Sequence, residues 1–253
     1  MSPAPSAAPA HRAPELLGQT VVVLGGSAGI GFETARRARA EGANLILTGR
    51  NAENLQRAAD DVGAQSTAAF DVSDHAQLER FFKGLPAQID HVMVTAGRPH
   101  YGRMIEMDLK DAQRALDDHL LLMLMVARHA SGKVRPSGTL LFMGGTGGRR
   151  PGIGIGLTST VTVASPMLTA NLALELAPVR VNLIAAGFVD TGLSAELLGD
   201  QLEARRTQLR NTLPIRRVVQ PSDVAALAVH IMTNTALTGA TFDIDGGQQL
   251  VAG

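Results

Sequence analysis

Seven short apolar segments alternate with helical segments, and this alternation constrains the fold more than any other feature of the chain. The apolar runs occupy residues 20–25, 44–48, 67–70, 89–94, 139–143, 180–184 and 240–244. Helical spacing of apolar residues is found at 30–41, 52–62, 75–83, 108–130, 160–177, 194–210 and 222–233. Strands that are apolar throughout and separated by helices predict a parallel sheet covered on both faces. Right-handed crossovers then favour a doubly wound α/β fold with about seven strands.

A single domain accounts for nearly all of the 253 residues. Residues 1–14 are rich in Pro and Ala and are expected to form a flexible tail, and residues 15–253 are expected to form the domain. The formal net charge is zero and there is no cysteine, which disfavours a nucleic-acid partner and excludes disulfides and thiolate metal sites. No metal site is expected. The longest apolar run, residues 120–127, is too short to cross a membrane, so we expect a cytoplasmic protein with no membrane partner.

A glycine-rich turn follows the first predicted strand and leads directly into a helix. Glycines in this position allow a tight turn and a close approach of the backbone to a pyrophosphate at the helix N-terminus. A flexible loop is the alternative, but the strand–turn–helix context favours a dinucleotide cofactor. The turn residues expected to hold it are Gly25, Ser27, Ala28, Gly29, Ile30 and Gly31.

The end of the second predicted strand indicates which dinucleotide is preferred. An NAD site would place an acidic residue there for the ribose 2′-hydroxyl, whereas this chain has Arg50. A guanidinium can pair with a 2′-phosphate, which favours NADP(H) over NAD(H), although a solvated surface arginine is the alternative. Asp71 and Val72 follow the third predicted strand and are expected beside the adenine, although an acidic turn residue is also ordinary there.

Several spaced motifs occur in an order known from one enzyme family. Residues 25–31 (GGSAGIG), 94–97 (VTAG), 172–182 (LALELAPVRVN), 186–191 (AGFVDT), 238–239 (TG) and 245–247 (DGG) carry the resemblance. They resemble the glycine turn, NNAG, PGxxxT and C-terminal motifs of the short-chain dehydrogenase/reductase family. The resemblance implies a single-domain Rossmann fold that binds a nicotinamide cofactor. It implies further cofactor contacts from Ala96, Gly97, Gly187, Val189 and Thr191, of which Thr191 would contact the nicotinamide carboxamide.

The catalytic residues of the family are absent. The family uses a Ser, a YxxxK pair and commonly an Asn, in which the Tyr donates a proton and the Lys lowers its pKa. The resemblance places other residues at these positions: Gly145 for Ser, Thr158 for Tyr, Thr162 for Lys and His119 for Asn. The only tyrosine is Tyr101, and the residue four positions later is Ile105. No alignment can therefore recover YxxxK.

Three groups of residues could take over part of this chemistry. His119 could transfer a proton near neutral pH, but a hydrogen-bonded histidine that packs in place of the Asn is the favoured interpretation. His100 and Tyr101 could supply an acid from the opposite wall, or could be ordinary exposed loop residues. Arg149 and Arg150 lie in a stretch with seven glycines, residues 144–156, and could bind an anionic substrate group or face water.

Three functions remain open on the sequence. The first is an atypical NADP-dependent oxidoreductase that reduces a carbonyl, an imine or a conjugated alkene in an unidentified small molecule. The second is a cofactor-binding pseudoenzyme or scaffold subunit, and the third is a non-redox lyase or isomerase. The family also implies a homodimer or homotetramer, with dimer faces on the helices at 108–130 and 157–177.

Overall fold

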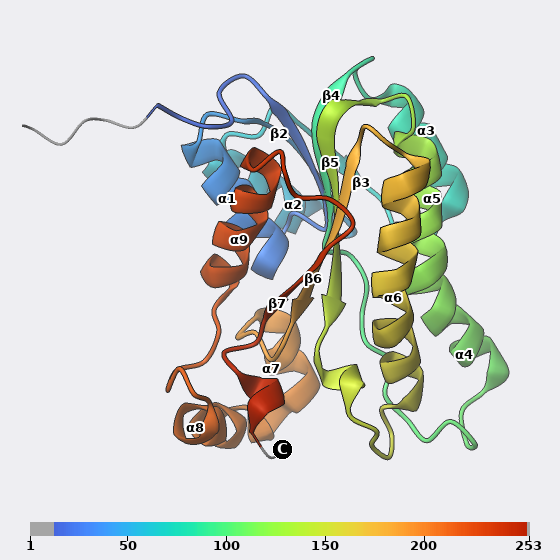
Figure 1. The fold of residues 1–253 in the computed structure, drawn as a ribbon, viewed down its shortest axis with the longest axis vertical. Coiled ribbons are helices and arrows are strands. Elements are labelled where there is room, and N and C mark those ends of the chain that lie inside the picture. The colour runs from blue at the N-terminus through green and yellow to red at the C-terminus, as the bar shows by residue number, and fades with distance from the viewer. Residues whose placement is uncertain (1–12, 252–253) are drawn as a thin grey trace, which may run out of the picture.

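Seven strands form one parallel sheet in the computed structural model, which describes residues 13–251 (Figure 1). The strands are hydrogen bonded in the order β3-β2-β1-β4-β5-β6-β7. The predicted doubly wound sheet of about seven strands is therefore confirmed. The strands are β1 (Thr20–Leu24), β2 (Asn44–Gly49), β3 (Ser66–Ala69), β4 (Ile89–Val94), β5 (Val134–Gly145), β6 (Arg180–Ala186) and β7 (Thr241–Ile244).

Helices cover both faces of the sheet. One face carries α1 (Gly29–Ala40), α2 (Ala52–Val62) and α9 (Pro221–Thr233), and the other carries α3 (His75–Gly84), α5 (Leu122–Ala130) and α6 (Gly156–Glu175) (Figure 1). The remaining helices are α4 (Leu109–Leu116), α7 (Gly192–Leu198) and α8 (Leu202–Thr212). No helix in residues 13–251 is both long enough and apolar enough to cross a membrane.

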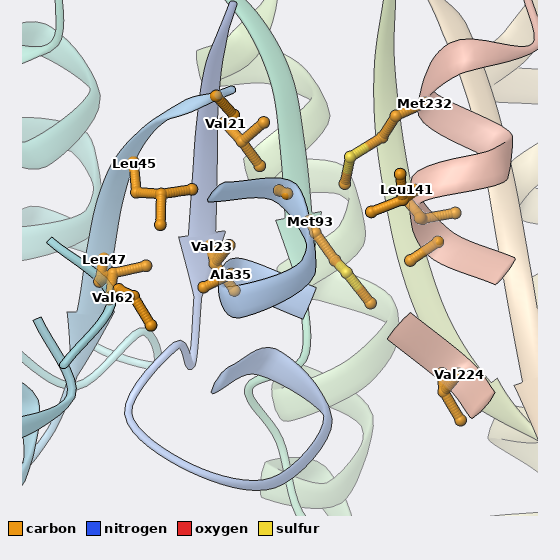
Figure 2. Close-up of a cluster of buried hydrophobic side chains, with 14 of the residues drawn as sticks. Val21, Val23, Ala35, Leu45, Leu47, Val62, Met93, Leu141, Val224 and Met232 are labelled. Atoms are coloured by element: carbon orange, nitrogen blue, oxygen red, sulfur yellow. The ribbon is translucent and has the colours of Figure 1, made fainter. Parts of the chain in front are cut away.

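The hydrophobic core is divided by the sheet into two clusters. Side chains of successive strand residues point to opposite faces, so Val21 and Val23 pack with α1 and α9, whereas Val22 and Leu24 pack with α3, α5 and α6. Figure 2 shows Val21 and Val23 beside the side chain of Met93, which comes from the neighbouring strand β4. Because β1 is buried on both faces, its sequence is apolar without alternation.

The strand order places a crevice at the carboxyl ends of β1 and β4. The chain passes from β1 to β2 on one side and later returns to β4 on the other, so the crossovers diverge at this point. Open α/β sheets bind ligands at such a switch point. α7 and α8 lie beyond the same edge of the sheet (Figure 1).

Two predicted helices differ in detail from those observed. The helix expected at 194–210 is divided into α7 and α8 at Gly199, whose φ of 49° lies in the left-handed region. The helix expected at 108–130 is continuous but contains a π-helical turn, η1 (Asp117–Leu121), between α4 and α5. Of the tail expected at 1–14, residues 1–12 lie outside the described residues.

Candidate active site

A cavity of about 610 Å³ lies at the carboxyl ends of β4, β5 and β6. Its walls come from these strand ends, from η1 and from α6, and residues of α7 and α8 close it on the far side. Most of the side chains that line it are apolar. A large apolar cavity with a few polar groups is typical of a site for a small molecule.

In the glycine turn at residues 25–31, the contacts around Gly25 and Gly31 are too close to admit a side chain at either position. A Cβ on Gly31 would lie 2.2 Å from the Gly25 carbonyl oxygen, so α1 could not pack this closely against the turn with any other residue. Gly25 has a φ of 94°, and a Cβ there would lie 2.8 Å from the Ala96 nitrogen. The turn is therefore a steric cradle that extends to the end of β4.

The N-terminus of α1 is open to an anion. Its N-cap residue, Ala28, provides no side-chain hydrogen bond, so the first N–H groups of the helix are not capped by a side chain. Unsatisfied N–H groups at the positive end of the helix dipole favour a phosphate. These features fit the pyrophosphate of a dinucleotide, held by the backbone of the turn.

Thr95 connects the two halves of this cradle and was not identified from the sequence. Its hydroxyl lies 3.2 Å from the Leu24 carbonyl oxygen and 3.0 Å from that of Gly25, and it donates towards these acceptors. The available signal was its position: Thr95 occupies one of the asparagine positions of the NNAG-like motif. The hydroxyl fixes the start of the glycine turn against the end of β4.

The remaining residues expected to bind the cofactor fall into two groups. Residues that line the cavity are Ile30, Ala96, Gly97, Gly187, Val189 and Thr191. Residues outside its lining are Gly25, Ser27, Ala28, Gly29, Gly31, Arg50, Asp71 and Val72. The two groups meet where a Cβ on Gly29 would lie 3.5 Å from the Thr191 methyl group. Thr191 also caps α7 by accepting a hydrogen bond from the Ser194 nitrogen at 3.2 Å.

Arg50 and Asp71 differ in how they are engaged. Arg50 is exposed at the end of β2 and has no hydrogen bond or ion pair with the residues that the structure describes. The Asp71 carboxylate accepts hydrogen bonds from the backbone N–H and hydroxyl of Ser73, at 3.0 and 2.8 Å. Arg50 is thus free to bind a phosphate, whereas Asp71 stabilises its own turn.

The catalytic wall, formed by Gly145, Thr158 and Thr162, lies together in the cavity as the family resemblance implies. The Thr158 hydroxyl donates to the His100 carbonyl oxygen at 2.8 Å, and the Thr162 hydroxyl donates to the Thr158 carbonyl oxygen at 2.7 Å. A Cβ on Gly145 would have no neighbour closer than 3.6 Å. Both hydroxyl protons are used within the protein, so neither group is positioned to protonate a substrate.

His119 lies in η1 and lines the cavity. Its Nδ1 is 3.1 Å from the Ala115 carbonyl oxygen, which can only accept, so Nδ1 carries the proton. The Nε2 atom faces Gly97, 3.8 Å from where a Cβ on that residue would lie. Burial lowers the pKa of the His119 imidazole. The neutral ring therefore presents an acceptor nitrogen at pH 7.

Asp118 is a second acceptor on this wall and was not singled out from the sequence. Asp118 lines the cavity, and its carboxylate lies 3.3 Å from His100 Nε2. The His100 ring stands edge-on to the His119 ring, with centroids 6.4 Å apart, but His100 itself does not line the cavity. Tyr101 does line it, and burial raises the pKa of its phenol. The π-helical turn, a feature frequent at functional sites, brings Asp118 and His119 to the cavity together.

Arg149 and Arg150, for which the sequence left open a substrate anion or solvent, bind other groups of the protein in the structure. Arg149 pairs with the Asp243 carboxylate, with Nη2 2.6 Å from Oδ1, and neither arginine lines the main cavity. The Arg150 guanidinium donates to the carbonyl oxygens of Gln249 and Val251. The partners are about 100 positions away along the chain, so sequence inspection could not identify them.

Comparisons with known proteins agree with the observed fold. The family model described as enoyl-(acyl carrier protein) reductase matches residues 25–249. Short-chain dehydrogenase/reductase ATR9 of Stachybotrys chlorohalonatus is 28% identical and covers 92% of this chain and 98% of its own. Short-chain dehydrogenase/reductase MalC of Malbranchea aurantiaca is 26% identical, and the match covers 96% of this chain and 99% of MalC.

Two solved structures have the same fold as this chain. The structure of MalC, described as a reductase/Diels–Alderase, superposes with a TM-score of 0.87 at 24% identity and covers 94% of this chain and 98% of its own. The structure of BdcA in complex with NADPH superposes with a TM-score of 0.82 at 26% identity and covers 92% and 95%. The chain belongs to the short-chain dehydrogenase/reductase family.

Proposed function

We propose that this protein is an NADP(H)-dependent reductase whose substrate accepts a hydride without receiving a proton from a tyrosine. The cofactor would lie on the turn at residues 25–31 and against Ala96, Gly97 and Thr191, with Arg50 on the 2′-phosphate. The open N-terminus of α1 and the unpaired Arg50 support NADP(H). The NADPH complex of BdcA, a relative at 26% identity, supports the same choice.

The observation that carries the proposal is the state of the two threonines in the catalytic wall. Thr158 and Thr162 both donate their hydroxyl protons to main-chain carbonyl oxygens. A ketone or aldehyde needs a proton on its oxygen as hydride arrives, and loss of a positioned general acid lowers the rate by about 10²–10⁴-fold. An iminium ion needs no proton as hydride arrives, whereas a conjugated alkene still needs a proton on the enolate that hydride addition forms.

The polar groups around the reacting space favour the iminium ion. His119 Nε2 is an acceptor, and Asp118 places a carboxylate on the same wall. These groups stabilise a cation, and they give no proton to a developing alkoxide. When bound, NADPH supplies the hydride that converts the C=N⁺ bond to a C–N bond, so that the amine and NADP⁺ are formed with no added proton.

Reduction of a carbonyl would need the protonated form of His119. Because burial lowers the pKa of this imidazole, the imidazolium is a minor form at neutral pH. Carbonyl reduction through His119 is therefore expected to be slow at pH 7 and to rise as the pH falls. A rate that instead rises with pH would contradict this role of the ring.

The proposal is tested by the rate of NADPH oxidation with three acceptors. These are the N-methyl dihydroisoquinolinium ion, α-tetralone as the ketone of similar shape, and cyclohexenone as the conjugated alkene. We expect turnover of the iminium ion at a rate at least about 100-fold above that of the ketone. The absence of turnover with every acceptor, in a protein that binds NADPH, would favour a pseudoenzyme instead.

A pair of variants tests the carboxylate on the cavity wall. Asp118→Asn removes the charge at nearly constant shape, and we expect kcat/KM for the iminium ion to fall about tenfold, a loss of about 1.4 kcal/mol. Asp117→Asn is the matched control, because Asp117 is in the same turn but does not line the cavity. An equal fall in both variants would indicate a general electrostatic effect.

A non-redox reaction is the second candidate. The description of MalC as both a reductase and a Diels–Alderase, together with a cavity of about 610 Å³ lined largely by apolar groups, supports it. Such a reaction would form product with no net change in NADPH. Product analysis by mass spectrometry, run beside the absorbance assay, separates the two candidates.

We also propose a homo-oligomer that pairs the helices α4 to α6. Large apolar side chains are exposed on α4 and α6: Leu109, Val163, Met167 and Leu174. Light scattering after size exclusion should give a dimer or a tetramer. Met167→Glu is expected to shift the protein towards the monomer, and a monomeric wild-type protein would contradict the proposal.

A further inference from the structure

A second, smaller pocket of about 160 Å³ lies beside the main cavity, on the side of α8. The two spaces share three lining residues, Gly147, Arg205 and Gln248, so they adjoin one another. We call the smaller space the side pocket. Its polar lining consists of Arg150, Arg205, Gln208, Thr212, Gln248 and Gln249.

The side pocket contains two guanidinium groups and no carboxylate among its lining residues. Arg205 is half-buried, and its one side-chain hydrogen bond within residues 13–251 goes to Gln208 Oε1 at 2.7 Å. Its sequence neighbour, Arg206, is instead paired with Asp190 at 2.6 Å. A partly desolvated guanidinium without a counter-ion is unfavourable unless an anion joins it.

Gln248 is also arranged to donate into the side pocket. Gln248 Oε1 accepts a hydrogen bond from the Phe188 nitrogen at 2.9 Å, which leaves the NH₂ end of this amide available as a donor. Arg150 donates to two backbone carbonyls, which hold its guanidinium at the pocket without neutralising the charge. Arginine forks suit the planar carboxylate and the phosphate group.

We propose that the side pocket binds an anionic group of the substrate, a carboxylate or a phosphate, remote from the reacting carbon. The apolar body of this substrate would occupy the main cavity, and Arg205 would select for the charge. The proposal rests on the proposed function, since it describes the substrate of the same site. It assigns to Arg150 and Arg205 together the anion binding that the sequence suggested for Arg149 and Arg150.

The test compares ligands that differ only in the charge of one end. Hexanoate, hexyl phosphate and hexanamide are titrated by calorimetry into the full chain, with and without saturating NADP⁺. We expect one or both anions to bind at least about tenfold more tightly than the amide, equivalent to about 1.4 kcal/mol. The better anion identifies the group as a carboxylate or a phosphate.

Variants assign the selectivity to the side pocket. Arg205→Gln and Arg150→Gln should each reduce the ratio of anion to amide affinity by about tenfold or more. Arg210→Gln should leave the ratio unchanged, because Arg210 is an exposed residue on the same helix and does not line the pocket. Thermal unfolding of each variant confirms that it is folded.

Two results would overturn the assignment: equal binding of the three ligands to the wild-type chain, or anion selectivity that persists in both pocket variants. The outcome is separable from the proposed function. Absence of NADPH oxidation with an iminium ion, while hexanoate selectivity depends on Arg205, refutes the reductase and leaves the anion pocket standing. Iminium turnover without anion selectivity refutes the pocket alone.

Discussion

The cofactor cradle and the catalytic wall lie at the same edge of the sheet but depend on different kinds of contact. In the cradle, a single added Cβ on Gly31 would lie 2.2 Å from a backbone oxygen. In the wall, a Cβ on Gly145 would have no neighbour closer than 3.6 Å. The cradle is therefore fixed by the backbone, whereas the wall leaves room for other side chains.

The two regions therefore differ in how far a substitution disturbs the structure. Substitution of Gly31 in the cradle disturbs the packing of α1 on the sheet. Substitution of Gly145, at the end of β5, meets only ordinary contacts. A function should thus be argued from the residues of the site and not from the fold.

The largest expected effect comes from restoring the family residues in the wall. The triple variant Gly145→Ser, Thr158→Tyr and Thr162→Lys supplies a general acid and a lysine that lowers its pKa. We expect the rate of α-tetralone reduction with NADPH to rise about 10²-fold or more. A triple variant that folds and binds NADPH but still does not reduce the ketone would contradict the view that the wall residues alone distinguish this site from that of the family.

Replacing one glycine in the cradle and one in the wall by alanine compares the two regions directly. Gly31→Ala forces overpacking against the Gly25 carbonyl, and we expect a loss of about 3 kcal/mol of stability together with loss of NADPH binding. Gly145→Ala meets only ordinary contacts and should change the stability by less than about 1 kcal/mol. Urea unfolding and NADPH titration measure both. Similar losses in the two variants would remove the distinction.

Acid should weaken the fold through a residue at the opposite end of the sheet. Burial, with the charges of Arg180 and Arg135, lowers the pKa of His91 to about 3. The unfolded chain therefore binds a proton below pH 6.5 that the folded chain does not, so stability falls as the pH falls. Between pH 7 and pH 5 we expect His91 to account for a loss of about 2 kcal/mol.

Urea unfolding of His91→Gln at the two pH values tests this effect. The variant should lose less stability between pH 7 and pH 5 than the wild type. His75→Gln is the matched control, because His75 is exposed at the start of α3. An unchanged pH dependence in His91→Gln would show that other groups control the response to acid.

The smallest expected effect concerns the cofactor phosphate. Arg50→Gln should weaken NADPH binding about tenfold and leave NADH binding unchanged, because only NADPH carries the 2′-phosphate. Arg57→Gln is the control, because Arg57 is an exposed arginine on α2. Calorimetric titration with both nucleotides provides the ratio. If NADPH binding and NADH binding are weakened equally, Arg50 contacts a part of the cofactor that both nucleotides share.

Sequence inspection located the sheet and the wall better than the other polar groups of the site. Strand positions follow from apolar runs, and Gly199 offered a signal for the break between α7 and α8 that was not used. The π-helical turn was not predicted, because a local change of hydrogen-bond register leaves the apolar spacing intact. Asp118 was missed for this reason. The pairing of Arg149 with Asp243 could not be predicted because the two residues are distant in the chain.

One measurement tests the central claim most directly. NADPH that carries deuterium at the transferable position of its nicotinamide is mixed with the protein and the N-methyl dihydroisoquinolinium ion. The account predicts one deuterium at the reduced carbon of the amine and one NADP⁺ for each product molecule. Product without deuterium, or no product while NADPH remains bound, would contradict hydride transfer at this site.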